Sequence, residues 1–304
     1  MIPFYLVTGF LGSGKTTLLR NILDTYSGSR RIAVIQNEFA PSGTDGKDLV
    51  MSGNPFKLVE VNNGSVFCVC MLGTFIQTLE KLIRDYAPEM IILEASGLSD
   101  PINIIELLQD VKIRESIHLG KIFSIVDAPN FDRGLKTIAR FKHQVMVADT
   151  VLINKTDLYK GDMQSLHEKI MEMNPFAEIM ETTYCKFPDK AFLSESIGNH
   201  IAAETFGEKE SEGRPSMKAV VLRIHNKIAL KDLENFILEL QKHCPRIKGH
   251  VNLNDGKVMA VQSVFDKYEV KEIANYRGPT ELVIFGENIN PGELRRKFLT
   301  YAGD

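Results

Sequence analysis

The segment Gly9–Thr17, GFLGSGKTT, constrains the fold more than any other part of the chain. An apolar run, residues 5–8, precedes it, and leucines and isoleucines at helical spacing follow it. The pattern GxxxxGK[ST] between a strand and a helix is typical of a phosphate-binding loop. Its glycines let backbone N–H groups turn inward at a helix N-terminus, where they meet phosphate oxygens. The sequence therefore predicts a nucleoside triphosphate site.

Within this loop each residue type has an expected role. Lys15 reaches the β- and γ-phosphates and stabilises the charge that develops on them. Thr16 offers its hydroxyl to Mg²⁺. The residues that we expect to bind the nucleotide here are Gly12, Ser13, Gly14, Lys15, Thr16 and Thr17.

Composition excludes few classes of protein. The chain has 304 residues, a hydrophobic content of 44% and a net charge of −3, so nothing general favours nucleic acid or an anionic membrane as a partner. Residues 1–3 lead straight into the first predicted strand without a basic segment, and no apolar run approaches membrane-spanning length. The four cysteines do not form a secreted disulfide framework. We expect a cytoplasmic protein.

Short apolar runs alternate with helical segments over the first two thirds of the chain. Several runs are continuous, as in strands that are covered on both faces. The predicted strands are Ile32–Ile35, Leu58–Val61, Met90–Leu93, Ile122–Val126, Val151–Ile153 and Ile179–Thr182, with helices such as Thr74–Asp85 and Leu166–Met173 between them. This order predicts an α/β domain with a mainly parallel sheet and helices on both faces. Ligands of such sheets bind at the carboxyl ends of the strands.

The polar stretch 204–216 contains two glycines and a proline and separates two regions of different character. We therefore predict a P-loop domain over residues 1–205, a linker over 206–216 and a smaller domain over 217–304. The predicted elements of the smaller domain are the strands Ala219–Ile224, Gly249–Leu253, Val258–Val264 and Glu281–Phe285, a helix Leu230–Lys242, and a last helix capped by Asn290 with Pro291 at its first position. This order resembles a small α+β domain of the ferredoxin-like βαββαβ type.

The predicted strand Met90–Leu93 runs into Glu94, and Gly97 follows. An acid at the end of a buried strand can hold Mg²⁺ through water, together with Thr16. Because Gly97 has no side chain, its N–H can approach a γ-phosphate closely, as in segments that sense triphosphate against diphosphate. The alternative is a flexible turn after a strand, but the phosphate loop upstream favours the functional interpretation.

The segment Asn154–Asp157, NKTD, indicates which base the bound nucleotide carries. Asp157 can accept hydrogen bonds from N1–H and the 2-amino group of guanine, which adenine does not offer, and an unpaired buried carboxylate would penalise ATP. We expect Lys155 to lay its stem over the base and Asn154 to tie this loop to the phosphate loop. The sequence therefore predicts a protein that binds GTP.

A third carboxylate, Glu38, follows the predicted strand Ile32–Ile35. A carboxylate that leaves a strand toward the phosphates is a candidate for orienting the attacking water or contacting Mg²⁺. The glycines and proline of the loop 40–46 suit a mobile switch, although a surface loop with a capping acid remains the alternative. The residues predicted to act in hydrolysis are Lys15, Glu38, Glu94 and Gly97.

Taken in order, these motifs resemble the CobW family of P-loop GTPases, relatives of the nickel-enzyme maturation GTPases. The resemblance extends over nearly the whole chain and rests on Gly9–Thr17, Asn37–Phe39, Asn62–Gly64, Glu94–Pro101, Val126–Ala128, Asn154–Asp157 and Arg246–Gly249. It implies GTP hydrolysis, a GTPase domain with a smaller C-terminal domain, and the delivery of a metal such as zinc or cobalt to a client metalloprotein or to metal-insertion machinery. Some members are linked to cobalamin synthesis.

The family's metal motif is C-x-C-C, and here the corresponding residues are Cys68, Cys70 and Met71. In an extended segment Cys68 and Cys70 point to the same side and can share an ion. Two thiolates need a further ligand, for which Glu38 is our candidate, because Met71 is a neutral donor better suited to Cu(I) than to Zn²⁺. The alternative is that both cysteines are small buried apolar residues. The seven histidines are scattered and do not form a metal store.

Two main functions follow. The first is a slow GTPase, since no arginine finger is evident, whose nucleotide state controls metal binding or delivery of Zn²⁺ or Co²⁺ to a client. The second is a GTP-dependent adaptor with structural cysteines and no metal of its own, which the missing third cysteine favours. The NKTD motif argues against a third reading, a P-loop kinase. A homodimer is left open.

Overall fold

The computed structural model describes residues 1–36, 56–60, 72–97, 101–108, 110, 112–113, 115–137, 139–187, 217–244, 246–264, 267–274, 276–287 and 289–303. The chain divides into two compact units. One comprises Met1–Met163 and Ala177–Lys209, and the other comprises Gln164–Phe176 and Glu210–Asp304. The linker predicted over residues 206–216 lies outside the described residues, so the domain boundaries stay a prediction.

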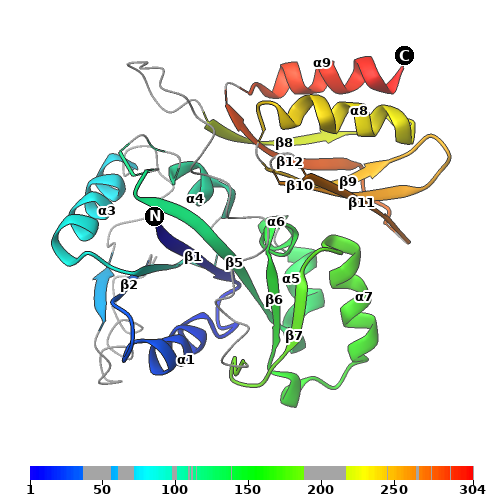
Figure 1. The fold of residues 1–304 in the computed structure, drawn as a ribbon. Helices are drawn as coiled ribbons and strands as arrows, with labels where there is room; N and C mark the ends of the chain where they lie inside the picture. The colour runs from blue at the N-terminus through cyan, green and yellow to red at the C-terminus, as the bar shows by residue number, and fades with distance from the viewer. Residues whose placement is uncertain are drawn as a thin grey trace. The chain divides into compact units, whose positions relative to one another are not determined.

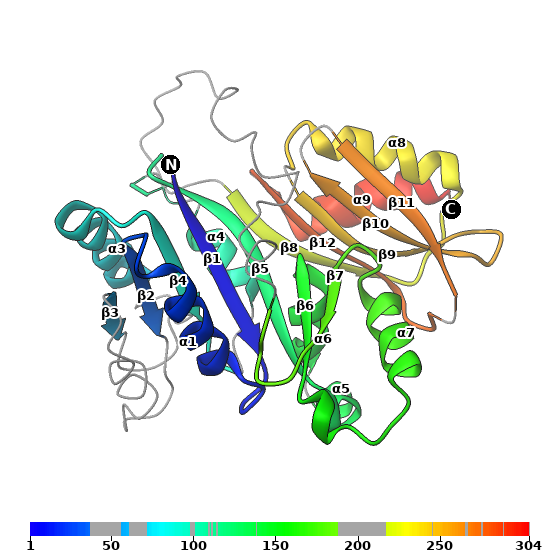
Figure 2. The same cartoon turned by 60° about the horizontal axis from the view of Figure 1, so that its bottom comes forward.

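The first unit is built on a parallel sheet of seven strands in the order β3-β2-β4-β1-β5-β6-β7, which Figure 2 shows side by side. The strands are β1 (Ile2–Gly9), β2 (Ile32–Gln36), β3 (Lys57–Glu60), β4 (Met90–Glu94), β5 (Ile117–Asp127), β6 (Thr150–Asn154) and β7 (Glu178–Glu181). Every residue of β2, β4 and β6 is buried, which explains why their sequences are continuous apolar runs. The parallel α/β prediction is confirmed.

Helices accompany this sheet on both sides. Figure 1 shows α1 on one side and α3 and α4 on the other. The helices of this unit are α1 (Lys15–Tyr26), α3 (Leu72–Tyr86), α4 (Pro101–Leu107), α5 (Phe131–Thr137) and α6 (Ala139–Val147), with short 3-10 turns η1 (Ala128–Asn130) and η2 (Thr156–Leu158). The helix α7 (Met163–Met173) belongs, except for its first residue, to the second unit.

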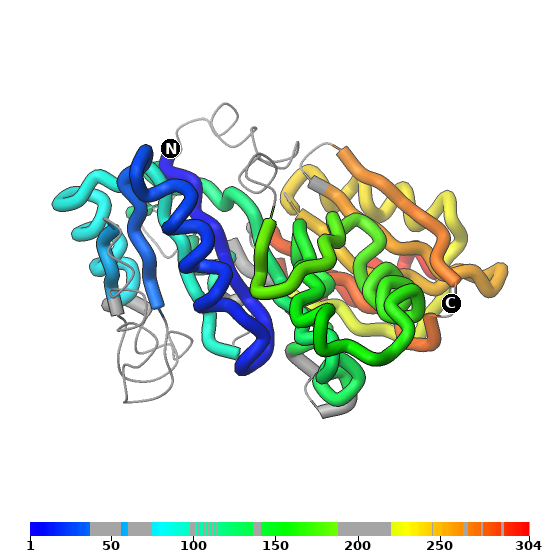
Figure 3. Tube along the Cα trace, turned by 90° about the horizontal axis from the view of Figure 1, so that it is seen from below, coloured from blue at the N-terminus to red at the C-terminus, as the bar shows by residue number. Residues whose placement is uncertain are grey.

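The phosphate-loop helix α1 is amphipathic because its apolar residues recur at helical spacing. Its buried apolar side chains are Leu18, Leu19, Ile22 and Leu23. They pack with alternate residues of β1, including Tyr5 and Val7. The helix α1 lies along β1 (Figure 3) and also contacts β4. This packing fixes the helix N-terminus, and with it the phosphate loop, against the carboxyl end of β1.

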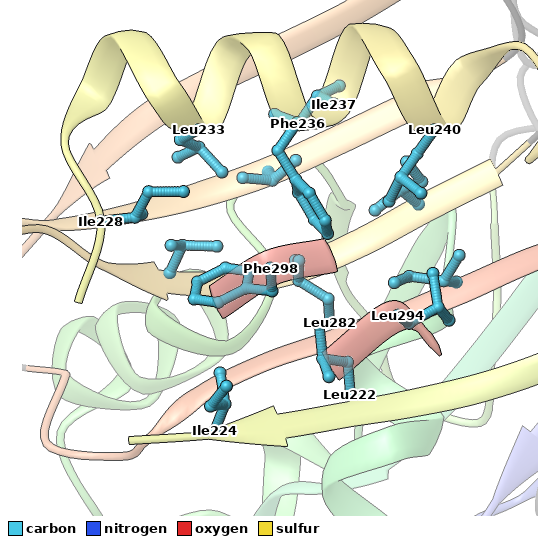
Figure 4. Close-up of a cluster of buried hydrophobic side chains, with 14 of the residues drawn as sticks. Leu222, Ile224, Ile228, Leu233, Phe236, Ile237, Leu240, Leu282, Leu294 and Phe298 are labelled. Atoms are coloured by element: carbon cyan, nitrogen blue, oxygen red, sulfur yellow. The ribbon is translucent and has the colours of Figure 1, made fainter. Parts of the chain in front are cut away.

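The second unit carries a five-stranded antiparallel sheet in the order β11-β10-β9-β12-β8. Its elements are β8 (Met217–Ile224), α8 (Leu230–Gln241), β9 (Arg246–Asn252), β10 (Val258–Val264), β11 (Lys267–Ile273), β12 (Thr280–Glu287) and α9 (Pro291–Ala302). Figure 4 shows the apolar core between the two helices and the sheet. Phe236 of α8 and Phe298 of α9 meet edge to face there, with ring centroids 5.3 Å apart.

The α+β class of this unit is confirmed, and the individual strands and helices predicted for it are present, but the likeness to a ferredoxin-like βαββαβ order is wrong. The order is βαββββα, because the strand β11, which was not predicted, lies between β10 and β12, and because the last helix follows the last strand, as its predicted position already implied. The strand β11 reads KYEVKEI and is half exposed at the edge of the sheet, so charged residues replace the apolar run that would have marked it.

Across the residues that the structure describes, no helix is long and apolar enough to cross a membrane.

Candidate nucleotide site

The predicted nucleotide-binding residues follow the carboxyl ends of β1, β4 and β6. The strands β4 and β5 flank β1 on opposite sides, although β4 and β5 both come later in the chain. Such a reversal of strand order opens a crevice beyond the carboxyl end of the central strand, where ligands of α/β sheets bind. The phosphate loop, residues 9–14, leaves β1 at this point and enters α1.

Gly14 is the residue before α1, and its backbone has φ 114°. A Cβ atom there would lie 2.5 Å from Asn154 Nδ2 and 2.9 Å from Cys185 Sγ. Both the backbone angle and the lack of space therefore require glycine. The same contacts show that the loops after β6 and β7 press directly against the phosphate loop.

Lys15 begins α1, and its side chain folds back over the loop. Its Nζ donates a hydrogen bond to the carbonyl of Phe10 at 3.1 Å, and only 8% of the residue is exposed. The N–H of Ser13 donates to the same carbonyl at 3.1 Å. The ammonium group thus already lies within the phosphate loop, where phosphate oxygens would compete with that carbonyl for it.

Thr16 and Glu94 meet as the sequence analysis expects for an Mg²⁺ site. The hydroxyl of Thr16 donates to Glu94 Oε1 at 3.1 Å, and Gln36 Nε2 donates to Oε2 at 2.8 Å. Glu94 is 7% exposed at the end of β4. A hydroxyl and a carboxylate are hard oxygen donors of the kind that Mg²⁺ prefers, so the residues present fit the ion.

Gly97 lies against the phosphate loop after β4. A Cβ atom there would be 2.6 Å from the backbone nitrogen of Leu11, so any side chain would collide with that loop. Its carbonyl accepts a hydrogen bond from Gln144 Nε2 at 3.3 Å. Gly97 therefore lies close to the loop that is predicted to bind the phosphates, and the approach of its N–H to a γ-phosphate stays a prediction.

The base loop, residues 154–157, is joined to the phosphate loop by a side chain. Asn154 Nδ2 donates to the carbonyl of Ser13 at 2.8 Å, and Asn154 is buried. Lys155 has φ 64°, and its Nζ lies 2.7 Å from Asp127 Oδ2. Asp157 is exposed within η2, where its carboxylate can meet a base.

Asp127 is a site residue to which the motifs assign no role. It ends β5 beside Asn154 and orients the ammonium group of Lys155, while Asn130 Nδ2 donates to its Oδ2 at 3.1 Å. Its other oxygen, Oδ1, is buried and has no hydrogen-bond partner among the described residues. Its place after a continuous apolar strand, the same signal as at Glu94 and Asn154, would have identified it.

Cys185 is a second residue that sequence reasoning missed. It is fully buried after β7, its N–H donates to Asn154 Oδ1 at 3.0 Å, and its thiol donates to the carbonyl of Gly14 at 3.4 Å. Burial raises the pKa of this thiol from 9.0 to about 12, and the nearby charge of Lys155 lowers it only in part. Cys185 is therefore a neutral hydrogen-bond donor within the site.

Three predicted residues of the metal and water sites, Glu38, Cys68 and Cys70, lie outside the described residues, as does Met71. Within the part of the chain that the structure describes, no group of three or more histidine, cysteine and acidic side chains could hold a metal ion. The transition-metal site therefore stays a prediction.

Family models match both regions of the chain. Residues 3–181 match the nucleotide-binding domain of CobW/HypB/UreG, and residues 217–301 match the C-terminal domain of the cobalamin synthesis protein cobW.

Curated relatives carry zinc in their names. "Zinc-regulated GTPase metalloprotein activator 1" of Schizosaccharomyces pombe is 32% identical over 196 residues, which cover 62% of this chain and 47% of that protein. "Zinc chaperone CobW" of Sinorhizobium sp is 33% identical over 52% of this chain and 51% of that protein. The chain thus spans about half the length of these two relatives. It aligns with "Zinc chaperone YjiA" of Escherichia coli over 98% of both chains at 26% identity.

The crystal structure of Zn(II)-bound YjiA GTPase from E. coli has the same fold over 99% of both chains. The TM-score is 0.53 and the sequence identity 22%.

Proposed function

Because the chain belongs to the CobW/HypB/UreG family of nucleotide-binding proteins, we propose that it binds and hydrolyses GTP and that its nucleotide state controls the binding and delivery of zinc. The client is a metalloprotein that receives the ion. This proposal extends to the present chain what the names of its relatives state: "zinc chaperone" and "zinc-regulated GTPase metalloprotein activator".

The observation that carries the GTP half is the hydrogen bond from Asn154 Nδ2 to the carbonyl of Ser13, at 2.8 Å. It joins a loop with the residue types that read guanine to a loop with the residue types that bind phosphates. A single ligand of the size of GTP would therefore meet Lys15 at one end and Asp157 at the other.

In the proposed reaction, water attacks the γ-phosphate and negative charge moves to the oxygen that bridges the β- and γ-phosphates. The loop N–H groups and Lys15 stabilise that charge because they are already in place. Thr16 and Glu94 are the residues that would hold Mg²⁺, which supplies charge neutralisation on the phosphates. We propose Glu38 as the residue that orients the water.

We further propose slow intrinsic turnover, because the chain's motifs include no arginine finger.

The location that we propose is the cytoplasm, since the two cysteines in the described part of the chain, Cys185 and Cys244, are free thiols, as is usual in a reducing compartment.

The test is the rate of phosphate release from GTP and from ATP, with and without Zn²⁺ or Co²⁺, on reduced protein. We expect slow release from GTP, little from ATP, and a change in rate when the cargo ion is added. The variant Lys15→Ala should lose release, whereas Arg20→Ala, an exposed residue of the same helix, should keep it. Equal rates with GTP and ATP would contradict the base assignment.

A second candidate is a GTP-dependent adaptor without a metal of its own. The observation that favours it is the sequence itself, which has Met71 where the family has a third cysteine. It is distinguished by the absence of a tight zinc site in a protein whose nucleotide-dependent binding of a client is intact.

A further inference from the structure

The loop Thr182–Cys185, which follows β7, has an uncommon backbone. Tyr184 has φ 55° and Cys185 has φ 52°, so two consecutive residues other than glycine occupy the left-handed region. Side chains disfavour this conformation, and it persists only where surrounding contacts determine it. The contacts that hold this loop therefore indicate what it is for.

Asn21 holds the loop from the phosphate-loop helix. It lies in the second turn of α1, and its single amide group donates to the carbonyls of both Tyr184 and Cys185, each at 2.9 Å. The two carbonyls belong to the two residues of the left-handed backbone, so Asn21 ties this part of the loop to α1.

Cys185 holds the loop from inside the site. Its thiol donates to Gly14 of the phosphate loop, and its N–H donates to Asn154 of the base loop. Farther along, the hydroxyl of Thr156 contacts Thr182 and Thr183, with oxygen–oxygen distances of 3.2 and 3.0 Å. The loop therefore bonds to both halves of the site, the half for phosphates and the half for the base.

We propose that Asn21 and Cys185 are positioning residues, which fix the base loop at a set distance and angle from the phosphate loop through the strained loop Thr182–Cys185. This inference deepens the proposed GTP site and rests on it. In physical terms, the base loop and the phosphate loop then bind the nucleotide as one rigid unit. Loss of the Asn21 or the Cys185 side chain lets the base loop move. The guanine then contributes less to the binding affinity, while the phosphates keep their contacts with the phosphate loop.

The test compares GDP, IDP and inorganic pyrophosphate as ligands of the full chain, by calorimetry in Mg²⁺ buffer. IDP lacks the 2-amino group, and pyrophosphate lacks the base altogether. For Asn21→Ala, which removes two hydrogen bonds, we expect GDP to bind about tenfold more weakly and the preference for GDP over IDP to shrink, while pyrophosphate affinity changes less than about twofold. Arg20→Ala, on the exposed side of the same helix, should change none of the three.

Cys185 gives an independent arm of the test. Cys185→Ala should reproduce the pattern of Asn21→Ala, and Cys185→Ser, which keeps a small donor, should restore most of the GDP affinity. If one variant does not fold, as judged by its thermal unfolding without ligand, the other carries the same comparison.

Equal losses for GDP and pyrophosphate would overturn the inference, because they would mean a general structural defect. Unchanged GDP affinity in both alanine variants would also overturn it. Failure of the unmodified protein to bind GDP would instead refute the proposed function, so the two failures are distinguishable.

Discussion

At the scale of single residues, the site depends on side chains that are oriented by other side chains. Asp127 holds the ammonium group of Lys155 at 2.7 Å, which leaves the aliphatic stem of Lys155 to lie along a base. Asp157, by contrast, is exposed and is the residue whose acceptors would meet guanine. In the proposed GTP site, one carboxylate would therefore recognise the base and the other would orient the lysine beside it.

The variant Asp157→Asn tests this division. It replaces a carboxylate oxygen with an amide donor, so the 2-amino group of guanine loses its acceptor while xanthine, with an oxygen at that position, gains a donor. We expect GTP affinity to fall by about tenfold to a hundredfold and xanthosine triphosphate to become the better ligand. Competition between the two nucleotides measures this, and a variant that keeps its preference for GTP contradicts the assignment.

The neutral thiol of Cys185 makes a prediction about alkaline pH. Its pKa is about 12 in the folded chain and 9.0 as an ordinary value, so the folded state binds the proton more tightly than the unfolded state. This contribution to stability is complete below pH 9 and is lost as the pH rises from about 9 to 12. At pH 10.5 the loss from this group is about 2 kcal/mol.

Urea unfolding at pH 8 and pH 10.5 measures the effect as a difference between the unmodified chain and Cys185→Ala. We expect the free energy of unfolding to fall more between these pH values in the unmodified chain. Other groups titrate in the same range, but they are common to both proteins and cancel. An identical fall in both contradicts a buried, neutral Cys185.

At the scale of elements, most strands can be predicted from the sequence, because strands that are buried on both faces consist of continuous apolar residues. The strands β2, β4 and β6 were predicted to within one residue of their bounds for this reason. The edge strand β11 could not be predicted in this way, because it is exposed to water and contains Lys and Glu as well as Val. In the site, motif spacing predicts Lys15, Thr16 and Asn154, but it cannot predict Asn21, which owes its place to a backbone conformation.

The helix α9 shows a local rule that does carry over from sequence to structure. Asn290 was predicted as its cap, and the side-chain oxygen of Asn290 accepts from the N–H of Gly292 at 2.8 Å. We expect Asn290→Ala to lower the free energy of unfolding by about 1 kcal/mol, because one helix-end N–H loses its partner. Asn290→Ser retains an acceptor and should lose much less; urea unfolding of the full chain decides, and equal losses would count against a capping role.

At the scale of the whole molecule, the proposed function needs two regions of the chain to act together, a nucleotide site and a metal site. The proposed GTP site consists of described residues of the first unit, whereas Cys68, Cys70 and Glu38, the predicted metal ligands, lie outside the described residues. In the sequence, Glu38 comes two residues after Gln36, the last residue of β2, which donates to Glu94 in the nucleotide site, and Cys68 and Cys70 come shortly before α3, which begins at Leu72. Coupling between nucleotide and metal is therefore the central claim.

The most direct test is an anaerobic zinc titration of the reduced full chain, loaded first with GDP and then with a GTP analogue that is not hydrolysed. We predict one tight zinc site whose affinity differs at least about tenfold between the two states, a coupling of about 1.4 kcal/mol. In the double variant Cys68→Ala/Cys70→Ala this site should be lost while GDP binding is kept. Equal zinc affinity in both nucleotide states, or full zinc affinity in the double variant, would contradict the account.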